Sequence, residues 1–513
     1  MKRRHFIASS TLPLLGCART QDIAGGFTGI EHQRGHMLRD RSSGSTPPPL
    51  RKTNVVILGG GVAGLAAARA LRLKGIEDFT LLELEDTVGG NSRGGAIKGI
   101  NCPLGAHYLP LPSDDAPEVQ DLLEELGLRQ RVAGRWQYDE RHLCHSPQER
   151  LFFNGAWQDG LLPVQDVGTA TLMQYQQMAL LVEQLRKQSR WMIPHVGRPL
   201  DPLQRELAAL TFASYLDQQG LNDRHLRWYL DYCCRDDYGA GLATVSAWAG
   251  IHYFASRHGF NAPGAETQER EALLTWPEGN AWLTRRMAAP LQARVHCGRV
   301  VLRIASVKHG VEVDAFNAAT QTLERWQAQR AIVALPLLVA SRVTESAPEF
   351  LLRAAAQIRY APWLVANIRL REALFDRPGP APSWDNVLYG APGLGYVDAM
   401  HQSLRPVPGA TVLSHYRALG DVPDGRRLLL NRPWSAWRDD ILAELSVAHP
   451  DLARKTSRID ITRYGHAMAI PVPLQTHQQR PQVLKHDRLS FAHSDWAGYS
   501  IFEEAFTMGH HAA

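Results

Sequence analysis

A glycine-rich turn between a short apolar run and a helical stretch is the feature that most constrains this chain. Val55–Leu58 is rich in β-branched residues, and Gly59, Gly61 and Gly64 follow it in a G-x-G-x-x-G pattern. These glycines allow a tight turn and let a phosphate approach the free N–H groups of the helix N-terminus. Glu83 ends the next apolar run, about 20 residues on, where an acid accepts hydrogen bonds from a ribose. The stretch therefore predicts a dinucleotide site.

A second glycine pair follows that acid. Gly89 and Gly90 complete an E-x-x-D-x-V-G-G arrangement that begins at Glu83. Glycines at these positions let another loop approach the same cofactor. The combination resembles the FAD-binding flavoprotein oxidoreductases of the amine oxidase and phytoene desaturase type. The resemblance implies that FAD is the cofactor and that Arg93 reaches its pyrophosphate.

The C-terminal stretch, Ser490–Ala513, resembles the second flavin motif of the same family, with His493 where the family has glycine. The resemblance implies that Asp495 accepts a hydrogen bond from the ribityl chain. It also implies that a helix starting near Ile501 and Phe502 points its N-terminus at the flavin, where its dipole stabilises the charge of the reduced ring. Further positions expected on the cofactor side are Val301, in the V-x-x-I of the adenine-side strand, and Gly105 and Ala106, in the turn after the phosphate loop.

The resemblance implies an α/β fold, in which a Rossmann-like FAD-binding domain is interrupted by an α+β substrate domain, as in amine oxidases. Apolar residues recur at helical spacing over 121–128, 172–188 and 203–219, whereas 295–316 alternates like paired strands with a turn at His309. We expect the FAD-binding domain to comprise 53–110, 280–345 and 485–513, and the substrate domain 111–279 and 346–484.

The N-terminus resembles a bacterial export signal. Arg3 and Arg4 precede a short apolar run, as in twin-arginine signals, and the residues up to Cys17 resemble a lipobox in which that cysteine is acylated. We expect a signal at 1–17, recognised by the twin-arginine export machinery, and a polar, flexible linker at 18–52. The folded protein would then be periplasmic, or anchored by lipid on the periplasmic side of the membrane. A chance basic start on a cytoplasmic protein is the alternative.

Composition excludes several other classes of function. The 513 residues include 21% charged residues and carry a net charge of +5 that is spread along the chain, with no basic run interleaved with aromatics. This pattern gives no support for nucleic-acid binding. No apolar stretch reaches the roughly 18 residues of a membrane span, and the cysteine spacing fits no metal site.

Two histidines are the candidate catalytic residues. His252 lies one helical turn after Trp248, and His466 lies shortly before the C-terminal motif. A histidine near the flavin could take a proton from an alcohol or an ammonium group, whereas a hydrogen-bonded core histidine is the alternative for each. Amine oxidases of this family usually carry a lysine on the strand that corresponds to 363–370, and this stretch has none.

We therefore expect an exported FAD-dependent oxidoreductase that transfers a hydride from a small or apolar substrate to flavin N5. An amine is the first substrate that the resemblance suggests. The alternatives are a desaturase-like C–C oxidation and a flavoprotein without turnover that relays electrons.

Overall fold

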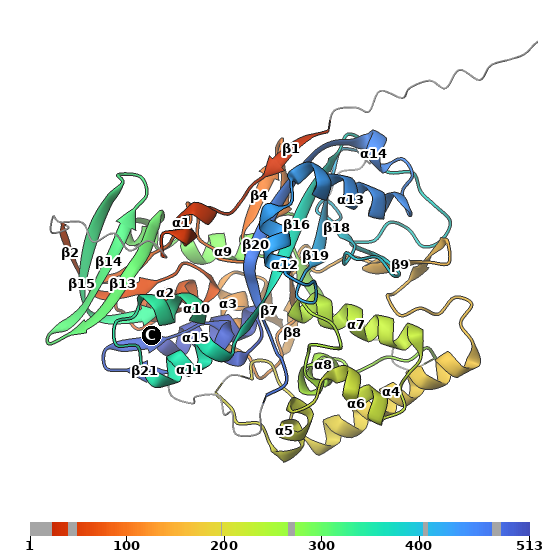
Figure 1. The fold of residues 1–513 in the computed structure, drawn as a ribbon, viewed down its shortest axis with the longest axis horizontal. Helices are drawn as coiled ribbons and strands as arrows, with labels where there is room; N and C mark the ends of the chain where they lie inside the picture. The colour runs from red at the N-terminus through yellow and green to blue at the C-terminus, as the bar shows by residue number, and fades with distance from the viewer. Residues whose placement is uncertain (1–22, 39–48, 196, 265–271, 404–408, 475–483) are drawn as a thin grey trace, which may run out of the picture.

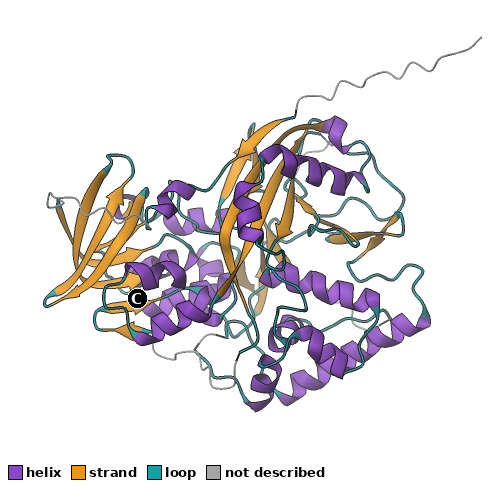
Figure 2. Cartoon of the chain, viewed as in Figure 1, coloured by secondary structure: helices purple, strands orange, loops and turns teal. Residues whose placement is uncertain are grey.

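The computed structural model describes residues 23–38, 49–195, 197–264, 272–403, 409–474 and 484–513. The expected export signal at 1–17 lies outside these residues. Two eight-stranded sheets organise the molecule, and helices pack around each of them (Figures 1 and 2). Within the described part of the chain, no helix combines the length and the apolarity needed to cross a membrane.

The first sheet has a parallel core that draws on three separated parts of the chain. β2 (Leu50–Leu58) lies between β3 (Phe79–Leu82) and β15 (Thr322–Val333), and β22 (Leu489–Phe491) pairs with the end of β15. All of these strands pair in parallel, and β2 is fully buried from Val55 on, as expected for a parallel strand covered on both faces. The sheet is completed by the predicted hairpin of β13 (Arg299–Val307) and β14 (Gly310–Asn317), and by β12 (Val295–His296) and β21 (Lys485–His486).

A helix from the beginning of the predicted FAD-binding segments packs against a helix from their end. α2 (Val62–Leu73) follows the glycine turn, and α15 (Phe502–Ala512) packs against it (Figure 1). A Cβ on Gly509 would collide with the carbonyl oxygen of Ala63, so the close approach of these helices requires glycine at that position.

The second sheet forms the centre of the other half of the molecule. Its long central strands, β16 (Arg359–Leu370) and β20 (Thr456–Ile470), pair in antiparallel fashion. The expected α/β class, with a second part that mixes strands and helices, is confirmed, while the exact domain boundaries stay a prediction. The other strands of this sheet are β1 (Ala24–Phe27), β19 (Val412–Ala418), β18 (Tyr396–Asp398), β17 (Asp385–Leu388), β9 (Glu149–Phe153) and β10 (Ala156–Asp159).

The remaining elements cover the sheets or connect them. The predicted helical stretches form α3 (Pro117–Glu125), α4 (Thr169–Gln188), α5 (Pro202–Ala208) and α6 (Phe212–Gln218). The other helices are α1 (His32–His36), α7 (Arg224–Tyr238), α8 (Ala247–Ala255), α9 (Ala281–Ala288), α10 (Leu337–Val343), α11 (Glu349–Gln357), α12 (Gly425–Asn431), α13 (Trp434–Ser446) and α14 (Leu452–Lys455), with 3-10 turns at Gln292–Arg294 and Ser494–Ala497. Small two-stranded sheets pair β4 (Gly94–Ile97) with β5 (Ile100–Pro103), β6 (Tyr108–Pro110) with β11 (Leu273–Thr275), and β7 (Arg129–Val132) with β8 (Arg135–Tyr138).

Residues 23–38 are ordered against the second sheet, whereas the sequence predicted a flexible linker over 18–52. β1 pairs in parallel with β20 at the edge of the second sheet, and the guanidinium of Arg463 lies 3.6 Å from the centre of the Phe27 ring. Further along, Arg34 donates to Asp86 Oδ1 at 2.7 Å, close to the predicted ribose acid. The linker prediction is wrong for these residues because β1, with the sequence AGGF, is a short edge strand held by backbone pairing, which so short and glycine-rich a stretch does not reveal.

Candidate functional site

The glycine turn forms the phosphate cradle that its sequence predicts. A Cβ on Gly59 would collide with the carbonyl oxygen of Ala334, and one on Gly64 would collide with that of Gly59. These contacts bring the start of α2 close to the end of β2. Gly61 is the N-cap residue of α2 and offers no side-chain cap, so the first N–H groups of the helix are available to an anion.

Glu83 is held by the backbone of two loops. Its Oε2 accepts from Gly60 N–H at 2.6 Å, and its Oε1 accepts from Glu85 N–H at 2.8 Å. Burial raises the pKa of this carboxyl, although both backbone hydrogen bonds act in the opposite direction. Each oxygen keeps a second lone pair, so the carboxylate can still accept from a ribose diol.

Glu83→Gln is expected to weaken FAD binding about tenfold, because an amide has one acceptor oxygen and leaves one buried N–H unpaired, at a cost of roughly 1–3 kcal/mol. Flavin fluorescence during titration of the apoprotein measures this change. Glu77→Gln is the control, since the Glu77 side chain is 59% exposed and pairs with Arg294 on the surface. Unchanged affinity in Glu83→Gln would remove the ribose role.

A second loop closes on the same cradle. Gly89 and Gly90 both have positive φ, and a Cβ on Gly90 would lie 3.2 Å from Gly61 Cα. Arg93 is buried, and its Nη1 lies 3.3 Å from Glu85 Oε2. Its Nε finds no hydrogen-bond partner among the described residues. A buried guanidinium N–H without a partner suits an anionic group such as a pyrophosphate.

The turn at Gly105 and Ala106 packs directly on that loop. Ala106 N–H donates to the carbonyl oxygen of Asn91 at 2.8 Å, and a Cβ on Gly105 would collide with the same oxygen. The hydroxyls of Tyr416 and Tyr464 donate to the carbonyl oxygens of Gly105 and Leu104, each at 2.9 Å. The second sheet therefore fixes the position of this turn.

Asp495 is anchored from three sides at the start of the C-terminal motif. Its Oδ2 accepts from Leu337 N–H at 3.0 Å and from the hydroxyl of Tyr360, and His493 Nδ1 lies 3.1 Å from Oδ1. Burial alone would raise the pKa of this carboxyl, but the charge and hydrogen bond of His493, together with the other donors, hold it below its usual range. Oδ1 keeps a second lone pair beside the contact with His493, so it can still receive a hydrogen bond from a cofactor hydroxyl.

The other predicted cofactor residues lie at the edges of this arrangement. Val301 is buried in β13, in the core around the first sheet. Ile501 is the N-cap residue of α15 without a side-chain cap, and Phe502 is the first residue of that helix. The N–H groups at the start of α15 are thus available, as the resemblance requires.

The two candidate histidines belong to different clusters. His252 is buried, stacks on Trp248 at 4.7 Å between ring centres, and meets the ring of Tyr499 edge-on at 5.4 Å. Its Nε2 lies 2.9 Å from the carbonyl oxygen of Met192, as in a hydrogen-bonded core histidine. His466 is exposed and lies beside the ring of Tyr360.

A cluster of aromatic rings that the sequence did not single out as a unit adjoins the Gly105 turn. We call His107, Tyr108, Trp384 and Tyr416 the aromatic cluster. His107 stacks on Tyr416 at 4.3 Å and lies 5.4 Å from Trp384, which meets Tyr108 edge-on at 5.9 Å. Burial lowers the pKa of His107 to about 3, although the Gly105 backbone opposes the shift, so its ring is neutral at neutral pH.

Two carboxyl groups lie near this cluster, since burial, and to a smaller extent the charges of Asp236 and Asp385, raise the pKa of Tyr416. Tyr108 hydrogen-bonds Asp236 on α7, and Tyr232 hydrogen-bonds Asp385 at the start of β17. Burial, and then the charge of Asp237, raise the pKa of Asp236 to about 7. Burial raises the pKa of Asp385 well above its ordinary value, and the neighbouring Asp236 adds to the shift. These surroundings disfavour the charged form of both carboxyls, and a cation bound beside them would favour it.

A family model described as flavin containing amine oxidoreductase matches residues 62–513. The chain belongs to this family. Members are flavoenzymes, so the protein is an FAD-dependent oxidoreductase, and the unpartnered Nε of the buried Arg93 fits the group that the family binds.

Relatives and solved structures agree with this family membership. An L-amino acid dehydrogenase of Synechocystis is 24% identical over 410 residues, which cover 75% of this chain and 77% of the relative. The structure of a putrescine oxidase with bound putrescine is 18% identical, covers 90% of this chain and 98% of its own, and superposes with a TM-score of 0.66. Cyclohexylamine oxidase from Brevibacterium oxydans is also 18% identical, with 91% and 98% covered and a TM-score of 0.63. These likenesses establish the shared fold.

Proposed function

We propose that this flavoenzyme oxidises a cationic amine that carries no carboxylate. The observation that carries the proposal is the pair of carboxyls, Asp236 and Asp385, against aromatic rings that continue directly from the Gly105 turn of the cofactor site. Aromatic faces and carboxylates together bind ammonium groups, through cation–π attraction and ion pairing. Above pH 7 the charge of Asp236 would repel a substrate carboxylate, which disfavours an amino acid.

Different residues would bind FAD, orient the amine and accept its proton. Gly61, Arg93 and the N-terminus of α2 would hold the FAD pyrophosphate, Glu83 the ribose, and Asp495 the ribityl chain. When bound, FAD supplies the acceptor for two electrons and a hydride. The aromatic cluster would orient the amine and exclude water from it. An ammonium must lose a proton before it can give up a hydride, and Asp236, with a pKa of about 7, suits the acceptor of that proton.

The strand that usually carries the family lysine presents a different side chain here. β16 starts its buried run near Trp363, whose ring lies 6.5 Å from that of Tyr416. A Cβ added to Gly239 would lie 2.7 Å from Nε1 of the Trp363 indole, so this indole packs against the end of α7. We propose that aromatic packing occupies the position where the relatives place a lysine, and that this member relies on Asp236 for proton transfer.

Anaerobic reduction of the bound flavin tests the proposed substrate class. Putrescine and cyclohexylamine should bleach the flavin absorbance, whereas L-amino acids and polyenes should bleach it slowly or not at all. Bleaching by a polyene alone would favour a desaturase-like C–C oxidation. If dithionite reduces the flavin and every organic compound fails, the protein is a flavoprotein without turnover on these classes.

We also propose that the protein is exported in folded form through the twin-arginine machinery, on the support of Arg3 and Arg4. Replacing both with lysine should trap FAD-loaded precursor in the cytoplasm, as fractionation and immunoblotting would show, while Lys2→Arg should leave export unchanged. Cys17→Ser should move the exported protein from the membrane to the soluble periplasm if a lipid anchors it. Normal export of the double variant would contradict the proposal.

A further inference from the structure

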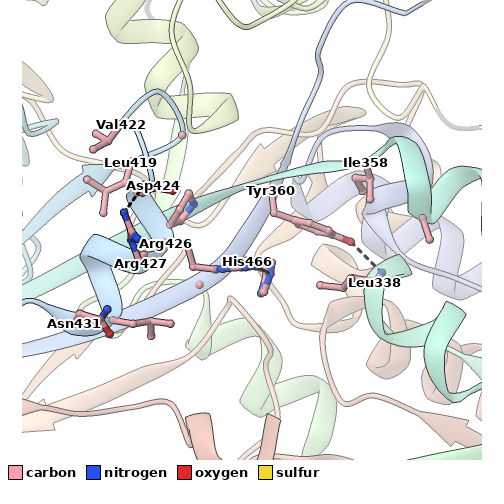
Figure 3. A pocket seen from close by; sticks show the side chains of 16 residues that line it. Leu338, Ile358, Tyr360, Leu419, Val422, Asp424, Arg426, Arg427, Asn431 and His466 are labelled. Atoms are coloured by element: carbon pink, nitrogen blue, oxygen red, sulfur yellow. Dashed lines mark hydrogen bonds and ion pairs between the residues drawn. The ribbon is translucent and has the colours of Figure 1, made fainter. Parts of the chain in front are cut away.

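A pocket of about 590 Å³ opens at the junction of the two halves of the molecule (Figure 3). Leu338 and Ile358, next to the first sheet, form one wall. The opposite wall consists of α12 and the loop before it, with Leu419 and Arg426. The side chains of Tyr360 and His466 lie between the two walls. The volume lies within the range of about 300–1,000 Å³ that small-molecule sites occupy.

A local irregularity of the second sheet puts His466 in this pocket. The pairing of β16 with β20 shifts register near Leu370 and again near Pro362. At the second place Ala361 faces Met468 and Trp363 faces Tyr464, so β20 has extra residues opposite Pro362. Proline cannot donate to the ladder, and the resulting bulge changes the direction of the side chains within it. His466 therefore lies among the residues that line the pocket.

The polar part of the pocket carries an excess of positive charge. Arg427 forms an ion pair with Asp424 at the pocket edge. Arg426, by contrast, has no carboxylate partner among the described residues, and its Nη1 contacts His466 Nε2 instead. A guanidinium next to an imidazole is left to attract an anion.

The apolar part of the pocket faces that charge. Leu338 and Ile358 stand opposite Leu419 and Val422, on the two sides of the Tyr360 ring (Figure 3). A ligand that satisfies both parts has an anionic head and an apolar body. A bare inorganic anion would leave the apolar walls unfilled, and a neutral hydrocarbon would leave Arg426 without a partner.

A single side chain, Tyr360, connects the pocket to the predicted cofactor site. The ring of Tyr360 lines the pocket, while its hydroxyl donates to Asp495 Oδ2 and lies 3.4 Å from Leu338 N. Asp495 is the acid of the C-terminal flavin motif. A molecule that moves the Tyr360 ring therefore changes the hydrogen bonding of Asp495, and bound flavin should report that change in its absorbance.

We propose that this pocket is a second binding site, separate from the aromatic cluster, for a small organic carboxylate with an aryl or alkyl body. Arg426 binds the carboxylate, Leu338, Ile358, Leu419 and Val422 hold the body, and Tyr360 transmits binding to the flavin site. The site requires bound FAD for its spectral readout and does not depend on which substrate the enzyme oxidises.

Calorimetric titration of the FAD-loaded full-length protein with 3-phenylpropionate tests the site, with the flavin difference spectrum recorded in parallel. We expect one equivalent to bind and to shift the flavin spectrum. Arg426→Ala should weaken binding about fivefold, the upper range for an exposed ion pair, and Arg426→Glu should weaken it further. Arg427→Ala is the matched control and should change affinity less than Arg426→Ala, because Asp424 already pairs with that charge.

The probes and variants separate this site from its alternatives. Equally tight binding of neutral 3-phenylpropanamide, or of inorganic phosphate, would overturn the combined recognition of charge and apolar body. Binding that survives Arg426→Glu and becomes tighter in Asp236→Asn, which removes a like charge from the aromatic cluster, would assign the molecule to that cluster and overturn the second site. Tyr360→Phe should keep the calorimetric affinity and reduce the spectral shift, and an unchanged shift would overturn the role of Tyr360. Circular dichroism and FAD content of each variant establish that it is folded.

Discussion

Gly61→Val is expected to give a folded protein that holds almost no FAD. Gly61 has φ of −72°, which valine adopts, and a Cβ there meets only Gly90 Cα, at 3.9 Å. The added side chain would therefore fit the apoprotein but fill the space at the N-terminus of α2 that the pyrophosphate needs. Overlap with a close-packed ligand costs more than ~3 kcal/mol, so FAD occupancy should fall at least about 100-fold.

Gly168→Val is the matched control for this variant. Gly168 is also an uncapped N-cap glycine, on α4, with φ of −75° and no atom within 4 Å of an added Cβ. It carries the same loss of backbone freedom without a neighbouring cofactor loop. FAD content from the absorbance ratio, together with thermal melting of the apoproteins, distinguishes the two. Normal FAD content in Gly61→Val would contradict the proposed pyrophosphate position.

Asp236→Asn should lower kcat/KM for putrescine about 100-fold, because losing a desolvated charge–charge contact costs roughly 2–5 kcal/mol. The amide keeps the shape of the side chain and removes only its charge. Asp217→Asn is the control, since the Asp217 side chain is 67% exposed and pairs with Arg227 at the surface. A loss of activity shared by both variants would point to a general effect on the protein.

The pH dependence of kcat/KM distinguishes a role of Asp236 in proton transfer from a purely structural role. The pKa of Asp236 is raised to about 7, so its carboxyl is neutral below that pH and charged above it. kcat/KM for a cationic amine should therefore rise as pH increases through about 7, and Asp236→Asn should abolish this rise. A wild-type profile that is flat between pH 6 and 8 would contradict the assignment.

The cofactor-binding residues could be predicted because each of their motifs consists of residues close together in the sequence. Gly59, Gly61 and Gly64 report a turn within six residues, and Glu83 follows at the end of the neighbouring strand. Each residue type is required by a contact in its own loop, such as the collision that any side chain on Gly64 would cause. Asp495 could be recognised for the same reason, within its own strand–turn–helix unit.

The substrate side could not be predicted in the same way. His107, Asp236 and Asp385 come from three distant segments, and only the packing of α7 against the second sheet brings them together. His466 was expected near the flavin, and the strand irregularity opposite Pro362, which places it in the junction pocket, could not be read from the sequence. β1 could not be recognised because it has only four residues, two of them glycine, and its edge pairing uses the backbone.

The dependence of the first sheet on its last strand has a consequence for how the protein matures. β22 and α15 complete the cofactor cradle from the final residues of the chain, whereas β2 and α2 lie near its beginning. Contacts of such long sequence separation form slowly, because the entropy of closing a long loop is lost before the contacts compensate for it. FAD capture should thus wait until β22 and α15 have been synthesised, and a product truncated before β22 would be colourless.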